Sequence, residues 1–245
     1  GWYAAAYRII SLPLFLPAVI MTAVFPALSA SSREEHSFNT IARRALEVTA
    51  LTTIPMAFGL VLVATALIRF FGYPEEFKDA VPALTILATT LPLVGINMMV
   101  GSVLAARDKQ RHWAIAGVVA AVFNVSLNFA AIPYTQSEFG NGAIGAAVVT
   151  SLTEVLLLCA GLMLVPRGVF NRDTLRYVLK CVAAGLVMGA ALWPIRDASV
   201  VVTVPLGAGA YFAAAFALQV VSKADLVSLR GLLSRPRAAA TAAQA

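Results

Sequence analysis

Among the polar side chains in or next to the long apolar stretches of this 245-residue chain, five are candidates for function: Arg8, Asn97, Asn124, Asn128 and Glu154. Glu154 is the only charged residue between positions 139 and 166, and it lies near the middle of that stretch. A carboxylate exposed to hydrocarbon at such a position costs roughly 3 kcal/mol. It must therefore face a cavity, find a partner or hold a proton. Two interpretations stay open: a substrate- or proton-coupled site, or a buried acid that ties helices together with the hydroxyl groups of its neighbours.

The three asparagines and the arginine also allow two interpretations each. Asn124 and Asn128 are four residues apart, which places them on one face of a helix, and Asn97 lies in an earlier apolar stretch. Side-chain amides either join membrane helices by hydrogen bonds or line a cavity. Arg8 either extends to the membrane interface or projects into a cavity, where a guanidinium group suits a phosphate. These residues are the candidates for a substrate cavity.

Catalytic and metal-binding patterns are absent from the sequence. It has no histidine within an apolar stretch, no paired acids, no Ser/His/Asp set and no Walker glycine loop. Its two cysteines, Cys159 and Cys181, both lie in apolar stretches without metal-ligand spacing. A retinal protein needs a lysine in the middle of its last helix, whereas Lys223 follows the last apolar stretch. We therefore predict a protein that is not an enzyme and that uses no cofactor or metal.

The composition indicates that most of this chain is surrounded by lipid and not by water. Hydrophobic residues make up 60% of it and charged residues 12%, with a mean hydropathy of +0.84. A soluble domain has about 25% charged residues, so this chain has too few to cover a water-exposed surface. The composition excludes a cytosolic enzyme, a nucleic-acid binder and a disordered chain, and it predicts the lipid bilayer as a partner.

The apolar stretches are long enough to cross a membrane. A spanning helix needs about 20 apolar residues, and only helices and closed barrels satisfy their own backbone in hydrocarbon. We predict an all-α, polytopic transmembrane bundle of seven spans, with a short interfacial helix at 41–47 before the second. The spans are 9–32, 48–68, 80–106, 112–137, 139–166, 175–195 and 198–222.

The basic residues indicate how the spans are oriented. Of the 18 Lys and Arg residues, fourteen fall in alternate connections on one side, and three, Arg69, Lys78 and Arg196, fall on the other. The positive-inside rule makes the first side cytoplasmic, together with the C-terminal tail. The positive charge is thus an orientation signal, and no nucleic-acid partner is expected. Gly1 then starts outside, from which we expect at least one further helix upstream. The fourteen are Arg33, Arg43, Arg44, Arg107, Lys109, Arg111, Arg167, Arg172, Arg176, Lys180, Lys223, Arg230, Arg235 and Arg237.

Several short motifs resemble one family of membrane exporters in their order and spacing. The sequence GWYAAAYR at 1–8 precedes a proline-containing apolar stretch that ends in FPALS at 25–29. Residues 1–166 resemble the lipid-linked oligosaccharide flippases of polysaccharide biosynthesis, within the multidrug/oligosaccharidyl-lipid/polysaccharide exporter superfamily. The further matching motifs are PMAFGL at 55–60, FFG at 70–72, AVPAL at 80–84, LPL at 91–93, GSVLAA at 101–106, Asn124 with Asn128 and Pro133, and GAIGAA at 142–147 followed by Ser151 and Glu154.

The resemblance implies the C-terminal part of a MATE-like exporter with two lobes. Residues 1–166 would be five helices of the second lobe, 167–222 two accessory helices, and 223–245 a partly disordered cytoplasmic tail. The missing N-terminal lobe of the same protein would be a partner. Arg8 matches a basic position and Glu154 an acidic position that are common in the family.

The function implied is transport by alternating access. Such a flippase moves an undecaprenyl-pyrophosphate-linked oligosaccharide across the bacterial inner membrane, as a multi-pass protein, for cell-surface polysaccharide synthesis. A multidrug/cation antiporter or a peptidoglycan-precursor flippase of the same superfamily is the alternative. The sequence leaves the sugar and the coupling ion open.

Overall fold

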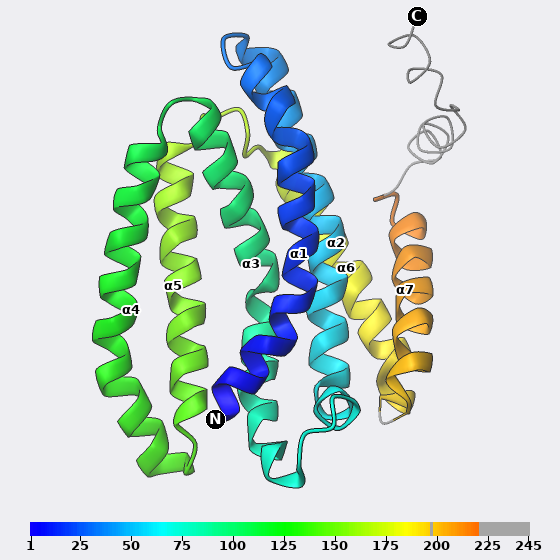
Figure 1. Ribbon diagram of the computed structural model, residues 1–245. Helices are drawn as coiled ribbons and strands as arrows, with labels where there is room; N and C mark the ends of the chain where they lie inside the picture. The colour runs from blue at the N-terminus through cyan, green and yellow to red at the C-terminus, as the bar shows by residue number, and fades with distance from the viewer. Residues whose placement is uncertain (197, 221–245) are drawn as a thin grey trace, which may run out of the picture.

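The computed structural model describes residues 1–196 and 198–220, and its regular structure there is helical throughout (Figure 1). Seven helices in this part of the chain are long and apolar enough to cross a membrane, which confirms the predicted all-α bundle. The predicted tail at 223–245 lies outside the described residues. The elements are α1 Trp2–Ala30, α2 Glu35–Phe70, η1 Glu75–Ala80, α3 Val81–Ala106, α4 Gln110–Phe139, α5 Gly142–Leu164, α6 Arg172–Leu192, η2 Trp193–Ile195 and α7 Val200–Ala217.

The second helix differs from the prediction in one respect. The expected interfacial helix at 41–47 is present, but it is continuous with the second span in a single helix of 36 residues. At 1.5 Å per residue α2 is about 54 Å long, whereas the hydrocarbon core is about 30 Å thick. Neither glycine nor proline interrupts the helix before Pro55, so nothing in the sequence ends it at the membrane surface.

The connections alternate between the two ends of the bundle (Figure 1). The links α1–α2, α3–α4 and α5–α6 lie at one end, and the N-terminus lies at the other with the links α2–α3, α4–α5 and α6–α7. The first three links and the helix ends next to them contain ten of the fourteen basic residues assigned to one side. The remaining four, in the tail, lie outside the described residues. The charge asymmetry of the described residues thus corresponds to one physical end of the bundle.

Three helices cross at Gly95 of α3. A methyl group on Gly95 would lie 2.9 Å from Cγ2 of Thr49, 3.0 Å from Cγ2 of Thr53 and 3.7 Å from Cβ of Pro17. Only a glycine lets α1, α2 and α3 approach this closely. The helix α3 is the most buried of the seven, and α4 is the least buried. Figure 1 shows that α1 is bent, and the helix contains Pro13, Pro17 and Pro26.

Trp113, near the start of α4, packs onto two further helices. A methyl group on Gly101 of α3 would lie 2.8 Å from Nε1 of Trp113, and one on Gly161 of α5 would lie 3.4 Å from its Cζ3. The two glycines therefore make room for the indole ring. This contact joins α3, α4 and α5 at the end of the bundle that contains most of the basic residues.

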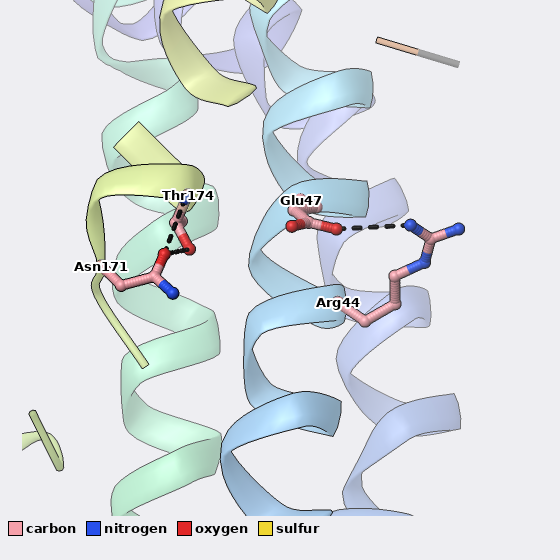
Figure 2. A network of polar contacts seen from close by, with 4 residues as sticks. All are labelled: Arg44, Glu47, Asn171 and Thr174. Carbon is pink, nitrogen blue, oxygen red and sulfur yellow. Dashed lines mark hydrogen bonds and ion pairs between the residues drawn. The ribbon is translucent and has the colours of Figure 1, made fainter. Parts of the chain in front are cut away.

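Polar side-chain contacts lie at the start of α6 and within α2 (Figure 2). Oδ1 of Asn171 accepts hydrogen bonds from the backbone N–H (2.8 Å) and the hydroxyl (2.9 Å) of Thr174, which caps the first turn of α6. On α2, Nη1 of Arg44 lies 3.3 Å from Oε2 of Glu47. The two residues are three positions apart on the helix. Such a partly exposed pair contributes little to stability.

The ring of Phe58 on α2 packs against Gly185 of α6, where there is no side chain. A methyl group on Gly185 would lie 2.5 Å from Cδ2 of Phe58, whereas one on Gly189 would lie 3.8 Å from Cδ1 of the same ring. Small residues spaced as in Gly185-xxx-Gly189 are typical of close contact between membrane helices, and here the neighbouring group is the Phe58 ring. This contact and the buried Tyr211 of α7 place α6 and α7 against α2.

The two glycines of this motif form a matched test of the α2–α6 contact. We expect Gly185→Ala to destabilise the protein by about 1–3 kcal/mol, because the added methyl group overpacks against Phe58. Gly189→Ala should change stability by less than about 1 kcal/mol, with alanine's better helix propensity in its favour. The measurement is the free energy of unfolding in mixed micelles. Equal effects of the two substitutions would contradict the packing described.

Candidate functional site

One helix presents a row of polar groups to three neighbours. Thr150, Thr153 and Glu154 of α5 follow a spacing of three and four residues, so they lie on one side of the helix. Thr150 bonds to α1, Thr153 to α4 and Glu154 to α3. We call these three residues the α5 polar row. One interpretation of the sequence was that neighbouring hydroxyl groups hydrogen-bond with Glu154. In the structure, each of the three residues forms a hydrogen bond with a different helix.

Glu154 pairs with Asn97, another of the sequence candidates. Nδ2 of Asn97 donates to the carboxyl oxygen Oε2 at 2.8 Å and to the backbone carbonyl of Glu154 at 2.9 Å. Oδ1 of Asn97 is buried and has no partner among the described residues. A hydrogen bond to a charged group returns about 1.5–3 kcal/mol, against roughly 3 kcal/mol for an unpaired carboxylate in hydrocarbon. One amide thus offsets much of the cost of placing this acid in the bundle.

The other two asparagines form a second connection. Nδ2 of Asn124 donates to Oγ1 of Thr153 at 2.9 Å, and that hydroxyl donates to the carbonyl of Val149 at 2.8 Å. Nδ2 of Asn128 donates to the carbonyl and to Oδ1 of Asn124, at 2.9 and 3.0 Å. Oδ1 of Asn128 is buried and accepts no hydrogen bond from a described residue. The pair therefore joins α4 to α5, and one acceptor is left over.

A cavity of about 580 Å³ lies between α1, α4 and α5 beside this second connection. The hydroxyl of Tyr3 lies 2.9 Å from Oγ1 of Thr150, and both residues line the cavity. Tyr3 also stacks on Tyr7, with ring centroids 6.0 Å apart. The four-residue spacing of the two tyrosines in the sequence does not indicate the bond to α5. The remaining lining residues are Asn124, Val125, Asn128, Phe129, Ile132, Pro133 and Ala146.

A second, apolar groove lies on the other side of α1. It is about 440 Å³ in volume and is formed by α1, α2, α6 and α7. None of its lining residues is charged, and Thr52, Thr203 and Tyr211 are its only polar side chains. Along α2 it extends from Leu51 to Phe71, which is roughly 30 Å at the helical rise and matches the thickness of the hydrocarbon core. No pattern along the chain indicates this groove, because four separate helices form it.

Arg8 lies apart from these features. Its side chain is exposed, and within residues 1–196 and 198–220 its guanidinium group forms no hydrogen bond or ion pair. It precedes Ile9, the first residue of α1 that lines the apolar groove. The structure thus brings together four of the five candidates, through the α5 polar row, and leaves Arg8 outside. Among the described residues no group of three His, Cys, Asp or Glu could hold a metal ion.

A double-mutant cycle tests the α3–α5 pair. We expect Asn97→Leu alone to destabilise the protein by about 1–3 kcal/mol, because it leaves the acid without its donor. In a Glu154→Leu background the same substitution should cost clearly less, giving a coupling of about 0.5–3 kcal/mol. Free energies of unfolding in micelles measure both. Additive effects would show that the hydrogen bond has no role in stability.

Comparison with known proteins connects this geometry to a family. Residues 1–212 match the family described as lipid II flippase MurJ. Two curated relatives come from Haloferax volcanii. The probable low-salt glycan biosynthesis flippase Agl15 is 28% identical over 155 residues, covering 62% of this chain and 31% of that protein. The probable flippase AglR is 30% identical over 173 residues, covering 69% and 35%.

A solved structure shares the fold. It is described as lipid II flippase MurJ in an inward closed conformation, and it matches with a TM-score of 0.72 at 22% identity. The match covers 87% of this chain and 46% of the other. The chain therefore spans about a third of the length of the curated relatives and less than half of the solved structure. Because residues 1–212 are most of the chain, and because the resemblance to lipid-linked oligosaccharide flippases is confirmed, this chain belongs to the lipid II flippase MurJ family.

Proposed function

We propose that the chain is the C-terminal part of a flippase that moves an undecaprenyl-pyrophosphate-linked oligosaccharide across the cell membrane by alternating access. Its family, described as lipid II flippase, and its relatives Agl15, a probable glycan biosynthesis flippase, and AglR, a probable flippase, support transport of a lipid-linked glycan. The observation that carries the proposal is the apolar groove beside α1. A lipid-linked glycan needs an apolar path for its tail and a separate polar path for its head group.

The groove suits a polyprenyl tail by length and by chemistry. It extends over roughly 30 Å along α2, the full depth of the hydrocarbon core, and it has no charged lining residue. A tail lying there would exchange contacts with lipid for contacts with leucine, valine and methionine side chains. The head group would follow the polar side of the bundle, and we propose that the exposed guanidinium group of Arg8, which lies outside the α5 polar row, binds its phosphate.

The polar side requires a second lobe to close it. The chain matches only about a third of its curated relatives by length. We propose that further helices of the same protein cover the cavity between α1, α4 and α5, where Oδ1 of Asn128 lacks a donor. On this proposal residues 1–166 belong to one lobe, and α6 and α7 are accessory helices that complete the groove.

A second substrate is supported by two observations. The family description and the solved structure both name lipid II. Lipid II and a lipid-linked oligosaccharide share a polyprenyl pyrophosphate and differ in the sugars, so the groove suits both. The related proteins are described as flippases, which are transporters. We therefore propose that this protein moves its substrate without changing it chemically.

Transport by the full-length protein distinguishes these substrates. In vesicles, we expect wild-type protein to move a lipid-linked oligosaccharide faster than lipid II, and Arg8→Ala to slow that transport at least tenfold by removing the phosphate contact. Arg196→Ala, on the link between α6 and α7, is the matched control and should transport normally. Transport of lipid II alone would show that lipid II, and not a lipid-linked oligosaccharide, is the substrate. Failure to move either lipid would overturn the flippase proposal.

Orientation in the membrane is tested by labelling. We propose that the end of the bundle with most of the basic residues faces the cytoplasm, because of its Lys and Arg excess. In a cysteine-free full-length background, single cysteines at Ser32 and Asp108 should be protected from an impermeant thiol reagent in whole cells. Cysteines at Glu75 and Glu138, which are exposed at the other end, should react. The reverse pattern would place the basic end outside.

A further inference from the structure

Glu154 is isolated from every other charged group. It forms no ion pair within the described residues. The helices packed against α5 are α1, α3 and α4. The titratable and charged side chains of these helices and of α5 lie toward the helix ends or on other turns, and none bonds to the carboxyl group. They are Tyr3, Tyr7, Arg8, Arg111, His112, Tyr134, Glu138 and Cys159.

The bond to the backbone fixes which way the Asn97 amide faces. A main-chain carbonyl only accepts hydrogen bonds, and the carbonyl of Glu154 lies 2.9 Å from Nδ2 of Asn97. The NH₂ group must therefore face Glu154, and one of its hydrogens is directed to Oε2 at 2.8 Å. The oxygen of the amide is directed away and buried. In this orientation Asn97 donates a hydrogen bond to the acid. Its amide oxygen faces away, so it cannot accept a hydrogen bond from a protonated carboxyl group.

This arrangement makes the hydrogen bond dependent on the charge of the acid. A carboxylate oxygen is a strong acceptor, and bonds to ionised groups are about twice as strong as neutral ones. When the carboxyl group takes up a proton on Oε1, Oε2 becomes a neutral carbonyl oxygen. The hydrogen bond from Asn97 then remains but loses its charge-assisted strength. The bond from Asn97 to the backbone carbonyl remains in both states. A neutral glutamine at 154 would give the same connection without the change.

We propose that the Glu154 carboxyl group is a proton-binding site that regulates the packing of α3 against α5. Taking up one proton converts the carboxylate to a carboxylic acid and loosens the side-chain connection to Asn97; releasing the proton to water restores it. The carboxyl group is only partly buried within the described residues. The role in transport rests on the flippase function proposed above, whereas the proton binding does not.

Infrared difference spectroscopy on the full-length protein in lipid vesicles tests the site directly. We expect a pH-dependent absorption of a protonated carboxyl group that Glu154→Gln abolishes completely. Glu138→Gln, which changes an exposed acid at the end of α4, should leave it unchanged. An identical band in Glu154→Gln overturns the proposal. A band that follows sodium concentration at constant pH also overturns it, in favour of a metal cation.

Two further measurements separate regulation from structure. Glu154→Gln keeps an acceptor for Asn97, so it should fold and transport, but with at least a threefold weaker dependence on pH than wild type. An unchanged pH profile would contradict the regulatory role. If Glu154→Gln does not fold, Asn97→Leu keeps the acid and removes its donor, so the carboxyl band must shift; an unshifted band overturns the proposal. A protein that moves no lipid but retains the Glu154 band refutes the flippase function alone.

Discussion

A hydrogen bond between Asn97 and Glu154 allows an acid to reside near the middle of a membrane helix. Hydrocarbon offers no water to pair with a polar group, so each such group needs a partner inside the protein. The acid is served by a single amide, whose other hydrogen is bonded to the backbone of the same residue. This double contact fixes α3 against α5 at one depth. The rest of the polar row then falls at positions where α1 and α4 can bond to it.

The bundle consequently has two sides of different chemistry. On one side, α1, α3 and α4 meet the α5 polar row, beside a cavity that contains polar side chains. On the other, α2, α6 and α7 form an apolar groove with α1. The helix α1 borders both, with Tyr3 on the polar side and Ile9 on the apolar side. A molecule with a polar head and a long apolar tail meets both surfaces around this one helix.

The spans could be predicted from the sequence because hydrocarbon requires about 20 apolar residues in a row, and all seven are helices in the described residues. The same reasoning placed Glu154 at mid-span and put Asn124 and Asn128 on one face. It could not say which helices face one another, because periodicity describes a single helix and its partners depend on packing. The pair Asn97–Glu154, the bond from Tyr3 to Thr150 and the groove are all contacts between distant segments. The continuous α2 was also missed, since the composition change near residue 47 marks the membrane surface and not a helix end.

The apolar groove connects this structure to the proposed function, because both candidate substrates have a polyprenyl tail that the groove could bind. Photo-crosslinking in lipid vesicles tests this claim most directly, using the full-length protein and a lipid-linked oligosaccharide with a photoreactive group in its tail. If the groove binds the tail, we expect crosslinks to residues that line it, such as Leu60 of α2 and Val204 of α7. Crosslinks concentrated instead on the outer face of α4, at Val118 and Val122, would contradict it.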